Sequence, residues 1–293
     1  MNNKQHFKFS DIGYYSILGP IFLVSLLPYG FLYHTFGKSI YIIAYYLLRY
    51  RYSVIVQNLS RSFPEKTYGE ITKITKDFYR HFARTAVENL KMFSISKKEI
   101  QQKTNILNLE EVAAVHKSGK KIVAMLGHYG NWECLNVLPE LLPFKVNALY
   151  KPLSNKTIGR VVAYSRTRFG MLLLPDQKAL SYLLRNKADA DLTLFIADQY
   201  PGRQNGYTYE LLHQSTQVFN GAEKLAKATD AAVFYVDFER NKKQGWDARF
   251  ILMEASAKNS EQGAITRLYV DHLEQSIRSA PEYWLWSHKR WKK

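Results

Sequence analysis

One short stretch constrains the fold of this chain more than any other: an apolar run that ends in a polar turn containing two glycines. Ile122–Leu126 is entirely apolar and short enough to be a buried strand. Gly127 and His128 follow it directly, and Gly130 precedes Asn131, which can cap a helix. The pattern predicts a strand, a tight turn and a helix, with His128 just beyond the carboxyl end of the strand.

The turn is followed by an acidic residue, Glu133, so that a histidine and a carboxylate flank it. A neutral imidazole can take a proton from an alcohol, and a carboxylate can fix its tautomer and stabilise the imidazolium that forms. Residues five apart on one helix diverge by roughly 140°, so these two side chains can meet only across a break such as the turn. We therefore expect His128 and Glu133 to pair. The competing interpretation is a core histidine bonded to a backbone carbonyl.

From Lys121 onward the sequence alternates between strand and helix patterns, whereas helical signals dominate before about Lys117. Thr67 and Glu70 form a capping box in the earlier part. We predict strands at Lys121–Leu126, Asn147–Tyr150, Met171–Leu174, Leu192–Ala197, Ala232–Phe238 and Arg249–Met253, and helices at Trp132–Leu142, Thr157–Arg168, Gln177–Asn186, from a cap at Asn220 through Thr229, and Gln262–Ala280. This alternation predicts an α/β fold with a central, mostly parallel sheet flanked by helices.

Charged residues stand at further element ends. Lys151 and Asp198 each follow a predicted strand, and Arg166 and Arg168 close the helix between them. Ligands of open α/β sheets gather beyond the carboxyl ends of strands, where His128 is also expected. Guanidinium forks suit phosphate or a developing oxyanion, although two surface arginines would give the same pattern. Asp198 has a comparable alternative as a turn-forming residue.

The N-terminal part is strongly apolar. No charged residue occurs over Ile12–Gly37, a stretch long enough to span or deeply enter a bilayer. A cleaved signal peptide is the competing interpretation, but a second apolar stretch, Ile40–Leu48, follows where small residues would be expected. Pro20 and Pro28 favour a kinked or partly inserted anchor as much as a full span. The basic residues from Arg49 onward mark an expected cytoplasmic edge.

Composition sets the remaining bounds. At 293 residues and 46% hydrophobic, the chain can bury one large core, so we expect a membrane anchor at residues 1–50 and a catalytic domain at 51–293. The net charge of +16 suits anionic lipid next to an anchor. A membrane-anchored basic nucleic-acid-binding module is the non-enzymatic alternative, although no recognisable nucleic-acid-binding signature is present. The single Cys134 excludes a cysteine-ligated metal cluster, and no metal is expected.

The chain resembles the bacterial lipid A late acyltransferases, within the wider lysophospholipid acyltransferase superfamily, in five motifs: GHYGNWE, YKP, SRTRFG, IADQYPG and EYWLWSHKRW. Their order and intervals match, and the resemblance runs from the N-terminal anchor and NLSRSFPE to Trp291. It implies a glycerolipid-acyltransferase-like fold at the bacterial inner membrane, with the catalytic domain on the cytoplasmic side and no cofactor. No G-x-S-x-G elbow occurs, which argues against a serine acyl-enzyme.

The resemblance also implies roles for individual residues. The histidine of the family's H-x4-D/E motif is the general base and the acidic residue is its partner, which assigns these roles to His128 and Glu133. The family's arginine-bearing helix end matches Arg166 and Arg168, and its aspartate after a late strand matches Asp198. We expect these last three residues, together with Lys151 of the YKP motif, to bind substrate.

The reaction implied by the resemblance is direct transfer of an acyl chain from acyl-carrier protein to a hydroxyl of a lipid A precursor. Donors from the Gly127–Gly130 turn, which Asn131 follows, or from Arg166 would stabilise the oxyanion. A lysophospholipid or aminolipid acceptor stays open. The SFPEKT segment looks like the FPEG motif of glycerolipid acyltransferases, but it precedes His128, and Lys66 replaces the glycine, which weakens that alternative.

Overall fold

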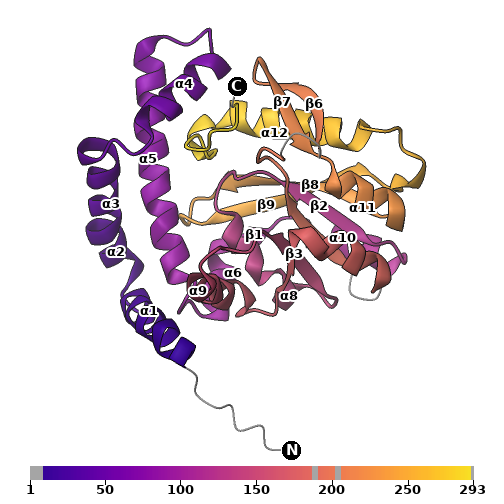
Figure 1. The fold of residues 1–293 in the computed structure, drawn as a ribbon, viewed down its shortest axis with the longest axis horizontal. Helices are drawn as coiled ribbons and strands as arrows, with labels where there is room; N and C mark the ends of the chain where they lie inside the picture. Colours follow the sequence, from indigo (N-terminus) through magenta and orange to yellow (C-terminus); the bar gives the residue numbers. More distant parts are fainter. Residues whose placement is uncertain (1–8, 187–190, 202–205, 292–293) are drawn as a thin grey trace, which may run out of the picture.

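A computed structural model describes residues 9–186, 191–201 and 206–291, and it has the predicted α/β architecture (Figure 1). The central sheet has seven strands in the order β1-β9-β8-β2-β5-β3-β4. All neighbouring strands in it are parallel except β8 and β9. The strands are β1 Thr104–Ile106, β2 Ile122–Leu126, β3 Val146–Tyr150, β4 Leu172–Pro175, β5 Leu192–Ile196, β8 Ala232–Arg240 and β9 Trp246–Glu254.

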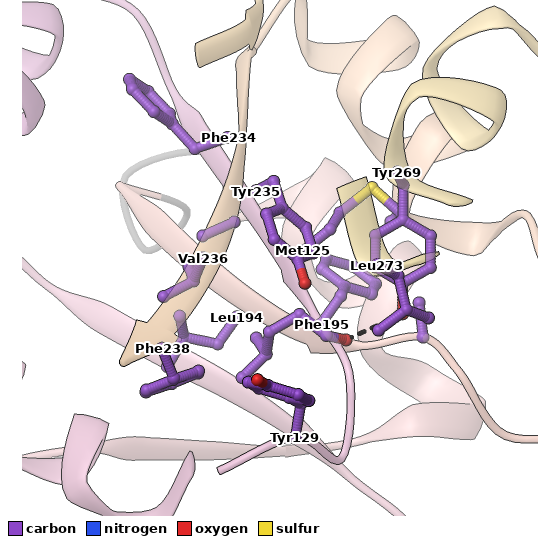
Figure 2. Close-up of a cluster of buried hydrophobic side chains, with 14 of the residues drawn as sticks. Met125, Tyr129, Leu194, Phe195, Phe234, Tyr235, Val236, Phe238, Tyr269 and Leu273 are labelled. Carbon is purple, nitrogen blue, oxygen red and sulfur yellow. Dashed lines mark hydrogen bonds between the residues drawn. The ribbon is translucent and has the colours of Figure 1, made fainter. Parts of the chain in front are cut away.

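The middle of the sheet is the core of the protein. Every residue of β2 is buried, because the strand has a neighbour on each side and is covered on both faces. Figure 2 shows Met125 of β2 gathered with side chains of β5 and β8 next to Tyr269 and Leu273 of the C-terminal helix α12, Ala264–Ser279. The Tyr269 hydroxyl donates to the Leu126 carbonyl oxygen at 3.0 Å, which fixes the end of β2 from which the His128 turn starts.

Helices flank the sheet. α5, Tyr68–Lys91, starts at the predicted capping box, which is confirmed: Thr67 Oγ1 accepts from the Glu70 backbone N–H, and Glu70 accepts from the Thr67 backbone N–H. The remaining helices after α5 are α6 Lys97–Lys103, α7 Leu109–Lys117, the 3₁₀ helix η3 Trp132–Val137, α8 Leu138–Leu141, α9 Lys156–Thr167, α10 Asp176–Arg185, α11 Gly221–Thr229, and the short 3₁₀ turns η5 Ala257–Asn259 and η6 Pro281–Tyr283.

The apolar N-terminal part is a chain of helices that runs beside α5 (Figure 1). It consists of α1 Phe9–Ser25, α2 Tyr29–Leu32, the π-helical turn η1 Tyr33–Gly37, α3 Lys38–Ile42, a second π-helical turn η2 Ile43–Leu47, and α4 Tyr52–Ser62. Among the described residues no single helix is both long and apolar enough to cross a membrane, but Asp11–Ser25 and Tyr29–Leu47 reach that length together, with a bend of 109° between them. Residues 1–8 of the expected anchor lie outside the described residues.

Three parts of the fold differ from prediction, one of them the short strand β1, which was not predicted. The expected helix Trp132–Leu142 is a 3₁₀ helix followed by one turn of α-helix, because Pro139 near the start of α8 has no N–H to continue the hydrogen-bond ladder of η3. A two-stranded antiparallel sheet, β6 Gly206–Leu211 and β7 Gln214–Phe219, was not predicted. The remaining expected strands are present with small shifts of their ends.

Candidate active site

The register of two central strands brings two polar side chains together. β2 and β5 are parallel neighbours, and Leu126 pairs with Ile196 at their carboxyl ends. His128 and Asp198 each lie two residues beyond that pair. Because parallel strands run out at the same edge, the two side chains emerge at the same level although 70 positions separate them in the chain.

His128 and Asp198 form a closely bonded pair. His128 Nδ1 lies 2.5 Å from Asp198 Oδ1, and the His128 backbone N–H donates to Asp198 Oδ2 at 2.8 Å. Trp284 Nε1 donates to the same Oδ2 at 2.8 Å. Burial by itself raises the pKa of the Asp198 carboxyl, but the charge and hydrogen bonds of His128 and the nearby charge of Arg290 together hold that pKa well below its usual range. Asp198 is therefore an ionised carboxylate that accepts hydrogen bonds only.

The second nitrogen of His128 remains for chemistry. Because an ionised carboxylate cannot donate, the neutral form of the imidazole keeps its proton on Nδ1, and in that form Nε2 is the lone-pair nitrogen. The side-chain amide nitrogen of Gln199 lies 3.2 Å from Nε2, and the ring of Trp132 packs edge-on at 4.7 Å between ring centroids. The His128 side chain is 15% exposed, so a substrate hydroxyl can reach Nε2. This arrangement matches the requirements of a general base.

Glu133 has a different partner from the one predicted. Its carboxylate accepts from Arg166 Nε at 3.0 Å on both oxygens and pairs with Arg166 Nη2, and Asn136 donates to it at 3.0 Å. Among the described residues no hydrogen bond joins His128 to Glu133. The physical reason is that η3 begins at Trp132, whose ring occupies the flank of the imidazole, and turns Glu133 toward α9.

The Glu133–Arg166 pair is enclosed and bidentate. The two side chains are 13% and 26% exposed, and the fork geometry is the strongest form of such a pair. Burial lowers the pKa of Arg166, but the attraction and hydrogen bonds of Glu133 outweigh it, so the pKa is raised overall. Arg166 thus holds the helix turn that carries Glu133 against α9.

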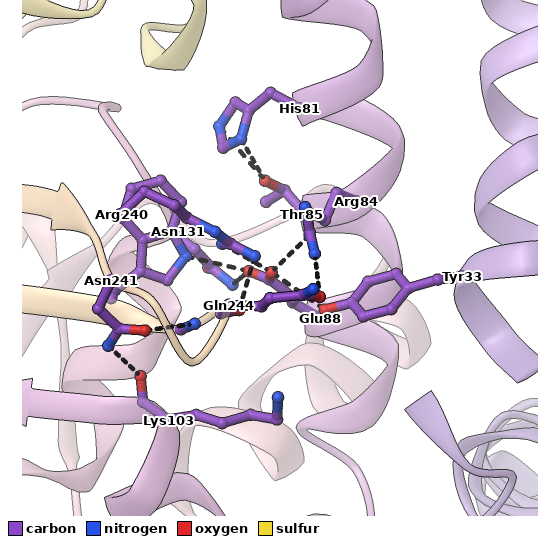
Figure 3. A network of polar contacts seen from close by, with 12 residues as sticks. Tyr33, His81, Arg84, Thr85, Glu88, Lys103, Asn131, Arg240, Asn241 and Gln244 are labelled. Carbon is purple, nitrogen blue, oxygen red and sulfur yellow. Dashed lines mark hydrogen bonds and ion pairs between the residues drawn. The ribbon is translucent and has the colours of Figure 1, made fainter. Parts of the chain in front are cut away.

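Asn131 connects the turn that carries His128 to a buried polar network around Glu88 of α5 (Figure 3). Its side-chain oxygen caps η3 by accepting from the Glu133 backbone N–H at 3.3 Å, and its amide nitrogen donates to Glu88 at 2.9 Å. The same carboxylate accepts from Trp246 Nε1 at 3.1 Å, from Arg240 at 2.9 Å and from the hydroxyl of Tyr33 at 3.2 Å. A single buried side chain therefore ties the turn to α5, to the β8–β9 pair and to the N-terminal helices.

Both glycines of the turn are required sterically. A Cβ at Gly127 would lie 2.6 Å from a methyl carbon of Leu273 and 3.4 Å from the Asp198 carboxylate. Gly130 has φ +65°, and a Cβ there would lie 3.0 Å from the Trp246 ring. A side chain at Gly127 would require the Leu273 side chain to move, and one at Gly130 would be disfavoured both by the positive φ and by the Trp246 ring.

The other two predicted binding residues, Lys151 and Arg168, lie in different surroundings. Lys151 is exposed at the carboxyl end of β3. The guanidinium of Arg168 donates to the carbonyl oxygens of Met92 at 2.5 Å and Ile95 at 3.1 Å, so it binds the loop after α5. The sequence reasoning did not single out Glu88 or Trp284. Trp284 lies in the quoted EYWLWSHKRW motif, which was the available signal for it.

Two hollows flank this site. One, of about 190 Å³, lies between α5 and the segment after α12, and its lining is largely aromatic and apolar: Phe78, His81, Phe82, Thr85, Ala86, Asn89, His128, Gly130, Trp132, Tyr283, Trp284 and Leu285. The other, of about 40 Å³, is bordered by Glu133 and Arg166 and is lined mainly by apolar residues of β2, β3, β4 and β5. In the described ranges, no group of three or more histidine, cysteine or acidic side chains is arranged to hold a metal ion.

Comparison with known proteins gives one consistent answer. The family model described as "Bacterial lipid A biosynthesis acyltransferase" matches residues 2–293. The chain is 20% identical over 229 residues to the "Lipid A biosynthesis acyltransferase" of Haemophilus influenzae, covering 78% of this chain and 72% of the relative. It is 21% identical over 276 residues to the "Lipid A biosynthesis palmitoleoyltransferase" of Escherichia coli, covering 94% of this chain and 89% of the relative.

Proposed function

Because the chain belongs to the bacterial lipid A biosynthesis acyltransferase family, we propose that it moves a fatty acyl chain from acyl-carrier protein to a hydroxyl of a lipid A precursor. Its relatives are named for lipid A acylation, one of them for transfer of a palmitoleoyl chain. The observation that supports the chemistry most strongly is the His128–Asp198 pair, which leaves Nε2 of His128 as a proton acceptor beside a large apolar hollow.

The proposed reaction is a single direct transfer. Nε2 of His128 takes the proton of the acceptor hydroxyl while the hydroxyl oxygen attacks the carbonyl carbon of the thioester, whose π electrons move to the carbonyl oxygen. When this tetrahedral oxyanion collapses, the C–S bond breaks and the departing thiolate takes the proton from the imidazolium. Asp198 stabilises the imidazolium in between, and it replaces Glu133 in the role that the sequence suggested.

We assign Glu133 and Arg166 to positioning. Their bidentate pair fixes η3, and η3 carries Trp132, whose ring rests against His128. A base must stay within hydrogen-bond reach of the hydroxyl, and small displacements cost much of the rate. Loss of the Glu133–Arg166 pair should therefore lower the reaction rate by displacing His128.

The hollow between α5 and the C-terminal segment suits the acyl chain of the donor. It is the larger of the two hollows beside the site, it is bordered by His128, and Phe78, Phe82 and Leu285 contribute apolar surface to it. An acyl chain in this hollow would have its thioester end near the imidazole.

We further propose that the N-terminal helices hold the protein on the inner membrane, with the catalytic domain on the cytoplasmic side where acyl-carrier protein is found. Large apolar side chains on these helices are exposed, including Leu23 at 66%, Leu47 at 71% and Leu48 at 72%. Exposed apolar surface of this kind is typical of a membrane-binding face.

The test is transfer by the purified full-length protein in detergent micelles, with acyl-acyl-carrier protein as donor and mass spectrometry of the products. A lipid A precursor should gain one acyl mass, and His128→Ala should lower the rate roughly 10²-fold or more. A lysophospholipid acceptor measured in parallel should be inactive. Transfer only to the lysophospholipid, or full activity of folded His128→Ala, would refute the proposal.

A further inference from the structure

Three of the donors first expected to stabilise the oxyanion are already in use. The His128 backbone N–H is bonded to Asp198, and the Gly130 backbone N–H donates to the Tyr283 carbonyl oxygen at 3.0 Å. Arg166 is held by Glu133 on both carboxylate oxygens. A donor that must first break an internal hydrogen bond gives back much of what it gains, so these groups are poorly suited to the role.

One buried cation near His128, the guanidinium of Arg290, is not held by such internal hydrogen bonds within the described residues. Arg290 is only 4% exposed, and within the described residues none of its three guanidinium nitrogens has a hydrogen-bond partner. Buried polar groups are nearly always paired, and a buried charge without a hydrogen bond is costly, so this group calls for a ligand. Its guanidinium also lies over the Trp284 ring, with Cζ 6.0 Å from the ring centroid.

Arg290 lies at the reacting centre rather than elsewhere in the core. It lines a small hollow of about 10 Å³ together with His128, Asp198 and Gln199. This hollow is smaller than the two described above, and it borders His128, whose Nε2 lies next to the Gln199 side chain. A space of this size fits a single polar atom such as a carbonyl oxygen, not an acyl chain.

The segment that carries Arg290 is fixed before any substrate binds. Asn58 of α4 donates to the carbonyl oxygens of Trp286 at 2.9 Å and His288 at 3.1 Å. Arg51 donates to the carbonyl oxygen of Ser287 at 2.8 Å. Donors held in place by the fold need no reorganisation when charge develops, which is the condition for effective transition-state stabilisation.

We propose that Arg290 is a catalytic residue that donates hydrogen bonds to the thioester carbonyl oxygen as it becomes an oxyanion. This inference rests on the proposed acyl transfer and adds the group that stabilises the negative charge on the carbonyl oxygen. An arginine keeps its charge at neutral pH, offers up to five N–H donors, and in a buried site interacts strongly with a negative oxygen. The nearby Asp198 charge partly offsets the cost of burying it in the free enzyme.

The experiment compares full-length Arg290→Met and Arg290→Lys with Arg249→Met, a matched control at an exposed arginine on β9. Two quantities are measured for each variant: kcat for acyl transfer, and the inhibition constant of an alkyl phosphonate analogue of the tetrahedral intermediate. Arg290→Met should lower kcat roughly 10²-fold or more and weaken the phosphonate by a similar factor, with little change in KM for the donor. Arg249→Met should match the wild type in both.

Folding is checked by thermal denaturation, where Arg290→Met should be no less stable than the wild type because it removes a charge without a hydrogen-bond partner. Should that variant not fold, Arg290→Lys carries the test, since it keeps the charge but loses the fork and should lose kcat and phosphonate affinity by the same factor. Unchanged kcat in a folded variant would overturn the proposal. So would a loss of kcat with full phosphonate affinity, which indicates that Arg290 acts only through Asp198. Inactive wild-type protein would instead refute the proposed function.

Discussion

Asparagine at position 198 tests the proposed site sharply, because the hydrogen bonds of the carboxylate decide how an amide would sit there. Asp198 Oδ2 accepts from two donors, the His128 backbone N–H and Trp284 Nε1, each at 2.8 Å. Oδ1 faces a single nitrogen, His128 Nδ1, at 2.5 Å. In Asp198→Asn the amide oxygen should therefore face the two donors, since the opposite orientation would bury N–H groups against one another.

The amide nitrogen of Asp198→Asn then faces His128 Nδ1 and donates to it. The imidazole proton must move to Nε2, and the nitrogen that should accept the hydroxyl proton is blocked. The same change in a Ser-His-Asp triad lowers kcat about 10⁴-fold through the wrong tautomer, so we expect a loss of roughly 10³- to 10⁴-fold here. The assay is steady-state transfer from acyl-acyl-carrier protein, with KM measured separately.

Stability gives a second readout of the same variant. The pKa of Asp198 is lower in the folded protein than in the unfolded chain, where it is about 3.9. The carboxylate therefore stabilises the fold above that pH, and the contribution is lost as pH falls through the folded-state pKa. Asp198→Asn should lower the free energy of unfolding at pH 7 by about 2 kcal/mol. It should also make this free energy less dependent on pH in the acidic range, as measured by denaturant titration.

Asp191 provides the control, because it lies directly before β5, at the opposite end of this strand from Asp198. Its carboxylate accepts from Lys121 at 3.0 Å, so Asp191→Asn also loses a charged contact. We expect lower stability and wild-type kcat. The tautomer argument fails if Asp198→Asn keeps more than roughly a tenth of the wild-type kcat, or if Asp191→Asn is equally inactive.

Three further outcomes are expected. Arg166→Lys keeps the charge but loses the fork on Glu133, so kcat should fall roughly 10- to 100-fold with a thermal midpoint near that of the wild type. Equal activity would show that the pair does not position His128. Glu88→Gln puts an amide nitrogen among the donors of Asn131 and its neighbours, so it should lower the free energy of unfolding in urea by about 1 to 3 kcal/mol. An unchanged urea midpoint would contradict this. Ala86→Phe should narrow the hollow beside His128 and shift donor preference to shorter acyl chains in a competition assay. An unaltered product profile would show that the acyl chain does not bind in that hollow.

Much of the fold was predictable because the sequence carries local signals for it. The apolar run of β2 and the capping box at Thr67 both depend on residues close in the chain. The hairpin β6–β7 was missed because its two turn residues, Leu212 and His213, adopt φ values of 52° and 61° without the asparagine or glycine that usually mark such a turn. β1 was missed because three residues are too few to show a period.

The candidate site was predictable in its members but not in their pairing. His128, Glu133, Arg166 and Asp198 could each be placed at the end of an element, and the structure brings all four to one edge of the sheet. Which carboxylate meets His128 depends on β5 lying beside β2, and strand order is not encoded in spacing along the chain. Local spacing favoured the nearer Glu133, whereas tertiary structure supplies the more distant Asp198.

The bond from Trp284 to Asp198 has a consequence for the protein during its synthesis. The imidazole, its carboxylate and the indole that shares this carboxylate leave the ribosome in that order. A nascent chain that has emerged only as far as Asp198 has the imidazole and its carboxylate but lacks the segment that closes over them. Under the proposed mechanism, the growing polypeptide should therefore not react with thioesters until residues 284–290 have been translated and have folded back onto the sheet.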